Sequence, residues 1–266
     1  MSEKPTYLEK KNAHTRDENI SFDEGPHIYT VNGEQGYTSV TTFIGKLFPA
    51  FDSEKCLENV LKSDKMLNPT YKYYGKTREQ ILEEWEKNRV EKSGAGTKTH
   101  FNIECYYNNI EVEDDSVEFQ YFKNFLKDYP ELEAYRTEWC VYYEEVKLSG
   151  SIDMVYRDKN TGEFLIYDWK RVKEIEYENK YGKTAIVDCI KEITDTNYWH
   201  YSIQLNIYRK ILQEKYDMKI TGLFLVVLHP NNPCKTYERL DVPFLDKEIE
   251  KLWEYRKEQL KKEISN

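Results

Sequence analysis

The sequence predicts a mixed α/β fold, in which a central mixed sheet of about four or five strands is flanked by helices. Aromatic and β-branched residues dominate three successive segments, 137–147, 149–157 and 163–170, and the polar sequence DKNTG separates the last two. An almost wholly apolar run at 221–228 has the character of a strand buried on both faces. Helical patterns precede and follow the three strands, so the expected order is helices, antiparallel meander, helix, strand and helix.

The N-terminal residues predict a polar arm followed by a hairpin and a short helix. Residues 1–20 are mostly polar, and we expect them to form an arm. Alternation over 27–38 around Asn32-Gly33 predicts a β-hairpin with that dipeptide at its turn. Ser39 is a suitable N-cap for a short apolar helix from Val40 to Phe48.

Residues 50–93 predict a helical excursion from the domain, and residues 94–228 form the expected core. The excursion contains helical patterns at 53–62 and 77–92. The sequence GAGT, residues 94–97, is expected to follow the second helix and to precede another that begins near residue 98. The remaining predicted helices are 98–107, 116–127, 198–215 and 244–263, and 171–196 is predicted to be irregular.

Composition favours one large globular domain over residues 1–266. Apolar residues make up 39% of the chain, Gly and Pro together number 19, and no flexible linker is apparent. The longest apolar run has six residues, from Leu223 to Leu228, whereas a membrane span needs about 20. The N-terminus lacks the apolar segment of a secretory signal. We therefore expect an intracellular protein without a membrane partner, cytoplasmic if it comes from a phage or virus.

Charge is unevenly distributed along the chain. The formal net charge is −9, and residues 104–145 alone hold 12 acidic and 3 basic side chains. By contrast, residues 61–80 hold five basic side chains, two acidic ones and three tyrosines. Such a stretch suits contacts with phosphates and unpaired bases, although a solvated surface loop has the same composition.

Two aspartates in the predicted meander are the strongest candidates for chemistry. If Asp158 pairs with Glu163 across the turn, Asp153 and Asp168 face each other on neighbouring strands, with Cβ atoms about 5 Å apart. Like charges at that distance repel, and oxygen ligands so placed suit Mg²⁺ or Mn²⁺. Lys170 points to the same face as Asp168. The alternative is an exposed pair on a solvated face, but the apolar neighbours of both residues favour a site.

Two predicted helices carry further polar pairs at a spacing of four residues. His100 and Glu104 share one helical face, as do Gln204 and Tyr208. Taken alone, each pair also fits an ordinary structural helix.

Together these segments resemble the PD-(D/E)XK nuclease superfamily, in its RecB-like exonuclease branch. The resemblance rests on GAGTKTH, GSID, IYDWK and QLNIY in this order, and it covers about residues 94–228. The segments at 27–52 and 72–89 are also similar to phage and large-virus relatives of mitochondrial genome maintenance exonucleases. Ile152 stands where the superfamily name has proline.

The resemblance implies a restriction-endonuclease-like fold and a role for each matching residue. His100, Asp153 and Asp168 would bind Mg²⁺ or Mn²⁺ through their side chains, and Trp169 through its carbonyl. Lys170 would position or help deprotonate the attacking water, with Gln204 and Tyr208 orienting Lys170 and contacting the nucleic-acid backbone. Glu104 would act as an outer acid. No iron–sulfur cluster is expected, because the five cysteines lie at least 35 positions apart.

A further set of residues is expected to bind substrate. Lysines, arginines and tyrosines would track phosphates or stack on bases, while hydroxyl groups at helix starts would hold a phosphate. The complete set is Ser39, Thr41, Lys72, Tyr73, Tyr74, Lys76, Arg78, Thr97 and Arg171. Within residues 61–80, the expectation is a helical arch over the site. An ordinary N-cap explains Ser39 and Thr41 equally well.

The predicted function is a metal-dependent DNA exonuclease that acts on single-stranded ends. The expected partners are DNA, as single strands or duplex ends, and proteins of replication, recombination or repair. Two alternatives remain open at this point. One is a structure-specific or RNA-directed endonuclease, and the other is a catalytically inactive nucleic-acid-binding module on the same fold.

Overall fold

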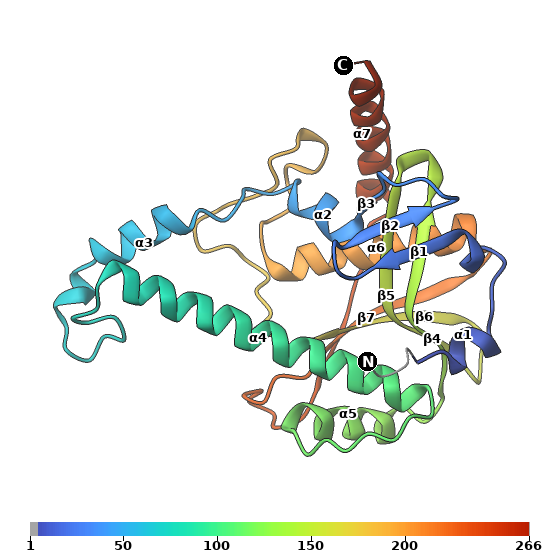
Figure 1. Cartoon of the computed structure of the whole chain (residues 1–266), viewed down its shortest axis with the longest axis horizontal. Coiled ribbons are helices and arrows are strands. Elements are labelled where there is room, and N and C mark those ends of the chain that lie inside the picture. Colours follow the sequence, from blue (N-terminus) through green and yellow to red (C-terminus); the bar gives the residue numbers. More distant parts are fainter. Residues whose placement is uncertain (1–4, 266) are drawn as a thin grey trace. The chain divides into compact units, whose positions relative to one another are not determined.

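The computed structural model describes residues 5–265, which form two compact units. One unit contains the described residues up to Pro49 and those from Thr99 onward, and the other contains Ala50–Lys98. The larger unit has a central mixed sheet flanked by helices (Figure 1). This confirms the predicted mixed α/β class. None of the described helices is long and apolar enough to cross a bilayer.

The central sheet has six strands, one or two more than predicted. Its meander consists of β4 (Leu132–Tyr143), β5 (Leu148–Asp158) and β6 (Phe164–Lys170), paired antiparallel as expected. The apolar strand β7 (Ile220–Val227) runs parallel to β6, and β8 (Glu238–Asp241), which was not predicted, pairs antiparallel with β7. The short β3 (Thr38–Ser39) pairs parallel with the start of β5.

The two edges of β5 are used differently. One edge pairs with β4 from Leu148 to Asp158. The other is shared by β3, at Leu148 and Ser149, and by β6, from Met154 to Arg157. Within the described chain, residues 150–153 therefore have no strand partner on that second edge. This opening in the sheet contains Asp153.

Two apolar clusters hold helices against opposite faces of the sheet. On one face, side chains of β5, β6 and β7 pack against α2 (Val40–Gly45), α6 (Asn197–Lys215) and α7 (Asp246–Ser265). On the other face, they pack against α5 (Val117–Asp128) and Ile103. Ile166 belongs to the first cluster, whereas Tyr167 and Trp169 belong to the second. Because side chains alternate along a strand, Asp168 lies on the face covered by α6.

The described part of the predicted polar arm is folded onto the sheet. It contains α1 (Tyr7–Lys11) and a 3₁₀ turn, Asp17–Asn19, and Leu8 is buried. The Asp17 carboxylate accepts hydrogen bonds from Arg136 Nη1 at 2.6 Å and from Trp139 Nε1 at 2.8 Å. The prediction of an arm is therefore wrong for residues 5–20, since the Asp17 carboxylate ties them to β4. Residues 1–4 lie outside the described residues.

The hairpin predicted at 27–38 is wrong in its strand pairing. Asn32 and Gly33 do form a tight turn with positive φ, bridged from Val31 to Glu34. However, β2 (Ile28–Val31) pairs antiparallel with β1 (Ile20–Asp23), and the chain after Glu34 continues to β3. The partner strand, Ile20–Asp23, lies in a segment for which the sequence analysis predicts no strand.

The glycines of GAGT do not interrupt a helix. Helix α4 runs without a break from Arg78 to Tyr107, so the prediction of separate helices at 77–92 and 98–107 is wrong. Neither Gly94 nor Gly96 has a positive φ, and a Cβ added at either would meet nothing within 4 Å. A glycine lowers helix stability by about 1 kcal/mol, which does not by itself end a helix of 30 residues.

The smaller unit has its own small core. Helix α3 (Ser53–Leu61) begins at the predicted position, capped by Asp52, whose side chain accepts a hydrogen bond from Lys55 N at 2.9 Å. Leu57, Tyr73 and Ile81 are buried together, and a 3₁₀ turn, Asp64–Leu67, follows α3.

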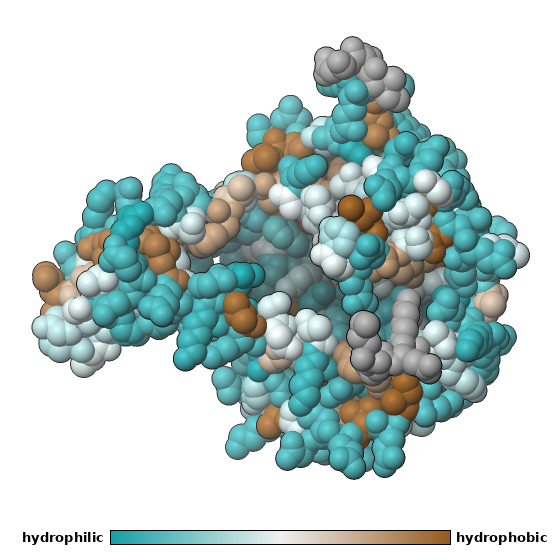
Figure 2. All heavy atoms as spheres, viewed as in Figure 1, coloured by the Kyte–Doolittle hydropathy of each residue, from teal (hydrophilic) through white to brown (hydrophobic). Residues whose placement is uncertain are grey.

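The predicted helices of the larger unit are largely confirmed. Ser39 caps α2, which ends three residues earlier than expected, and α5, α6 and α7 match their predicted ranges to within two residues. The irregular segment at 171–196 contains one 3₁₀ turn, Asp188–Ile190. On the face shown in Figure 2, hydrophilic side chains predominate and hydrophobic ones form separate small groups.

An uninterrupted α4 predicts that alanine at Gly94 strengthens the helix. Alanine should lower the free energy of the helical state by about 0.5–1 kcal/mol, which slows amide hydrogen exchange around residue 94 by roughly two- to fivefold. Native-state hydrogen exchange measures this. Gly75→Ala is the matched control. Gly75 has a φ of 69°, at which alanine is strained, so this variant should not gain the stability expected for Gly94→Ala. Faster exchange in Gly94→Ala would contradict a continuous helix.

Candidate metal and catalytic site

Asp153 lies where β5 and β6 separate. The ladder of hydrogen-bonded pairs ends at Met154 with Tyr167. Beyond it the Asp153 side chain replaces a strand partner, because Asp153 Oδ2 accepts a hydrogen bond from Trp169 N at 2.9 Å. The Asp158 amide also donates to Glu163 O at 2.9 Å, as the predicted register requires. The register is thus confirmed, and extending it by one residue places Asp168 opposite Asp153.

Asp168 is held from two sides. Its side chain is 2% exposed, Lys170 Nζ lies 2.6 Å from its Oδ2, and Gln204 Nε2 of α6 donates to its Oδ1 at 3.4 Å. The Lys170 ammonium also lies 4.5 Å from the centre of the Tyr201 ring. The structure therefore brings Asp168, Lys170 and Gln204 together, and Gln204 contacts Asp168 where the prediction had it orienting Lys170.

Tyr208 reaches the strand edge beside Asp153. The residue is buried on α6, and a Cβ built at Gly150 would lie 2.6 Å from its hydroxyl oxygen. Only glycine therefore leaves room for the tyrosine ring at this point of β5. Burial raises the pKa of Tyr208 well above its ordinary value, so its hydroxyl stays protonated.

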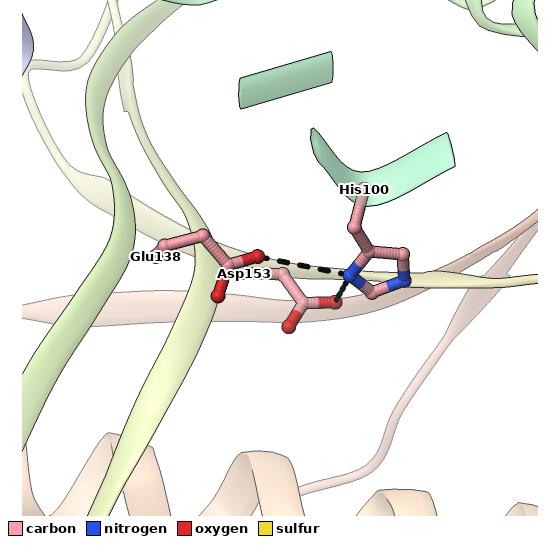
Figure 3. A group of neighbouring side chains, drawn as sticks. All are labelled: His100, Glu138 and Asp153. Atoms are coloured by element: carbon pink, nitrogen blue, oxygen red, sulfur yellow. Dashed lines mark ion pairs between the residues drawn. The ribbon is translucent and has the colours of Figure 1, made fainter. Parts of the chain in front are cut away.

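His100, near the end of α4, contacts residues of β4, β5 and β6. Its Nε2 lies 2.8 Å from Trp169 O, and because a carbonyl only accepts, Nε2 carries a proton. Its Nδ1 faces two carboxylates, 3.5 Å from Asp153 Oδ2 and 3.7 Å from Glu138 Oε1 (Figure 3). The Trp169 carbonyl, predicted as a metal ligand, here accepts a hydrogen bond from the imidazole.

Glu138 is the site residue that the sequence analysis missed. The pairs Thr137–Met154 and Trp139–Ile152 place it opposite Asp153. The register also sets Glu138, Asp153 and Asp168 in one row across three adjacent strands. Glu138 has a φ of 42°, a conformation that costs a non-glycine residue about 1–3 kcal/mol. Ser151 Oγ donates to its Oε2 at 2.9 Å.

Burial and mutual repulsion shape the ionisation of this row. Burial raises the pKa of Asp168 to about 6, which Lys170 opposes and the neighbouring Asp153 reinforces. Burial likewise raises the pKa of Asp153. Burial would lower the pKa of His100, but Asp153 and Glu138 outweigh it and raise that pKa to about 9. For Lys170, Asp168 and Asp153 overcome burial and raise the pKa, so the ammonium form dominates.

The donor set fits a divalent cation. His100, Glu138 and Asp153 each offer one ligand atom, and these atoms all lie within 4.8 Å of one another. Together with Asp168, the row carries three negative charges when all its carboxylates are ionised. Lys170 neutralises one of these charges, and a neutral His100 adds none. The remaining excess of two negative charges equals the charge of one divalent ion, and oxygen-rich ligands suit Mg²⁺ or Mn²⁺.

The other predicted residues of the larger unit lie in ordinary structural contacts. Glu104 is buried and lines a cavity together with Glu138. Ser39 caps α2 by accepting from Thr42 N at 3.1 Å, and its hydroxyl lies 3.2 Å from that of Thr41. Arg171 Nε donates to Glu118 Oε1 at 2.6 Å, with both side chains largely buried. Their roles toward substrate stay predictions.

The predicted substrate residues at 72–97 lie in the smaller unit, where several already have partners. Tyr73 is 4% exposed and accepts a hydrogen bond from Trp85 Nε1 at 2.6 Å, so it has no free face to stack on a base as predicted. Tyr74 is 50% exposed and keeps that possibility. The remaining contacts pair Lys72 with the Tyr73 ring, Lys76 with Glu84, Arg78 with Glu54, and Thr97 Oγ1 with Ser93 O.

Comparison with known proteins does not assign the chain to a family. No protein-family model matches the sequence, and no curated protein shows significant similarity to it. The arguments about function therefore rest on the site itself.

The raised pKa of His100 predicts a pH dependence of stability in the metal-free protein. A histidine whose pKa in the folded state lies above 6.5 stabilises the fold fully below that pH, and this contribution disappears as the pH rises through about 9. Relative to His100→Gln, wild type in EDTA should lose roughly 3 kcal/mol of unfolding free energy between about pH 6 and pH 10. Urea unfolding across this range measures the difference, and parallel pH curves for the two proteins would contradict the arrangement.

Proposed function

We propose that the protein is a Mg²⁺- or Mn²⁺-dependent deoxyribonuclease with a restriction-endonuclease-like core of the PD-(D/E)XK type. One observation carries this proposal: Asp153 and Asp168 meet where two strands separate, and Lys170 follows two residues after Asp168 on the same strand. The contact from Gln204 to Asp168 and the position of Tyr208 on α6 support it further, because both residues lie on the expected helix.

The implied metal would be held by Asp153, Asp168 and His100. When bound, such an ion supplies a Lewis acid that makes water a nucleophile near neutral pH and neutralises charge on a phosphodiester. The two excess negative charges of the row of carboxylates support this assignment, because they match the charge of one divalent ion.

Lys170 acts as a positive hydrogen-bond donor in this proposal. Its pKa is raised by Asp168 and Asp153, so the ammonium is a poor proton acceptor at neutral pH. It can instead donate to a phosphate oxygen or orient a water while Asp168 and the Tyr201 ring fix its position. Gln204 fixes the Asp168 carboxylate from the opposite side.

Action on DNA ends in replication, recombination or repair is the form of this activity that we propose. It comes from the likeness of the four motifs to RecB-like exonucleases. The exposed Tyr74 in the smaller unit is available to stack on an unpaired base.

Lys170→Ala is expected to lower the rate of DNA hydrolysis by about 10²–10³-fold, because it removes a donor aimed at developing charge. End-labelled linear single strands, linear duplex and circular DNA would be incubated with Mg²⁺, Mn²⁺ or EDTA. Lys247→Ala, on the exposed surface of α7, is the matched control and should behave as wild type.

The substrates distinguish the alternatives. Metal-dependent loss of linear strands with circles spared supports the exonuclease, and cutting of circles indicates an endonuclease. DNA binding without hydrolysis in all three proteins would overturn the nuclease proposal in favour of a binding module.

A further inference from the structure

The proton on His100 Nε2 determines which nitrogen is available to a metal ion. Since Nε2 donates to Trp169 O at 2.8 Å, the neutral imidazole has its lone pair on Nδ1. Metal-binding histidines commonly donate their second ring N–H to a carboxylate or a backbone carbonyl, which fixes the ring orientation. The contact with Trp169 O is of that kind, and it turns Nδ1 toward Asp153 and Glu138.

The two carboxylates in front of Nδ1 come from neighbouring strands. Asp153 Oδ2 and Glu138 Oε1 lie 3.5 Å and 3.7 Å from Nδ1. Their side chains are 11% and 30% exposed, so this side of the row is accessible from solvent. The Asp168 side chain is 2% exposed and already contacts Lys170 and Gln204. An incoming ion therefore reaches Glu138 and Asp153 more readily than Asp168.

A strongly acidic cavity lies next to Glu138. It has a volume of about 310 Å³ and is lined by one basic residue, Arg136, and by several acidic ones, namely Glu9, Asp17, Glu24, Glu104 and Glu138. Arg136 is bound to Asp17 at 2.6 Å, so its charge is compensated locally. A cavity of this sign concentrates cations and repels phosphates. Cations gathered in it would lie next to Glu138, which lines the cavity.

We propose that His100 Nδ1, Glu138 and Asp153 form a divalent-cation site, with Glu138 as a direct ligand. This inference rests on the proposed metal-dependent function and adds a carboxylate from β4 to the residues that the nuclease motifs imply (Figure 3). Asp153 then binds the ion and also holds β5 and β6 together, because its Oδ2 accepts a hydrogen bond from Trp169 N. Ser151 positions Glu138 by donating to Oε2.

The mixed donor set favours Mn²⁺ over Mg²⁺. Magnesium strongly prefers oxygen ligands in near-ideal octahedral geometry, whereas imidazole nitrogen suits the transition metals. Mn²⁺ is also observable directly, because free Mn²⁺ gives an electron paramagnetic resonance signal that decreases when the ion binds.

The test is a Mn²⁺ titration of the full chain, freed of metal with EDTA and then desalted, without DNA. Glu138→Gln keeps the size of the side chain and removes its charge, so Mn²⁺ should bind at least about 10-fold more weakly than to wild type. Glu133→Gln is the matched control, since Glu133 lies on the same strand in an exposed ion pair with Lys11. Its Mn²⁺ affinity should equal that of wild type.

If Glu138→Gln does not fold, a second variant, Glu138→Asp, tests the same proposal. Circular dichroism reports folding, and Glu138→Asp keeps the charge but withdraws the carboxylate by one methylene, so it should also bind Mn²⁺ more weakly. Wild-type affinity in a folded Glu138→Gln or Glu138→Asp protein overturns the proposal, as does a wild type that binds no Mn²⁺ at millimolar concentration.

Failure of this site and failure of the nuclease function give different results. If Mn²⁺ binding depends on Glu138 but DNA stays intact, the cation site stands and the proposed activity does not. If DNA hydrolysis requires metal while Glu138→Gln binds Mn²⁺ as wild type does, the nuclease stands and Glu138 is not a ligand.

Discussion

The hydrogen bond from Trp169 N to the Asp153 carboxylate is the interaction on which the site depends. It closes the junction where β6 leaves β5, so a side chain takes the role that a strand partner has elsewhere in the ladder. In this position the Asp153 carboxylate lies in one row with Asp168 and Glu138. Repulsion within the row is reduced by Lys170 on one side and by His100 on the other. The sheet topology thus creates a local excess of negative charge, which a divalent cation would neutralise.

The meander and its register could be predicted because their determinants are local. A five-residue polar turn fixes the pairing of β5 with β6, and from that pairing the opposition of Asp153 and Asp168 follows. The helical positions of His100, Gln204 and Tyr208 follow equally from local periodicity. Their convergence on the two aspartates was expected only from the resemblance to nucleases, since periodicity says nothing about which helices approach the sheet.

Glu138 could not be predicted because its position depends on the pairing of β4 with β5. That pairing is set by the connection through Glu144–Val146, which ends at Lys147 with a φ of 46° and has no strong sequence signal. The hairpin error has a similar cause: Asn32-Gly33 specifies a turn but not which strand pairs with β2. For α4, the sequence GAGT was expected to lie between two helices, but its two glycines do not end a helix of 30 residues.

A crystal structure of the metal-free protein soaked in Mn²⁺, with anomalous diffraction data, tests the central claim most directly. The account predicts an anomalous peak at the row of carboxylates, in contact with Asp153, Glu138 and His100, while Trp169 O still accepts from the imidazole. The absence of a peak there at saturating Mn²⁺, or ordered manganese only at surface carboxylates away from β4 and β5, would contradict it.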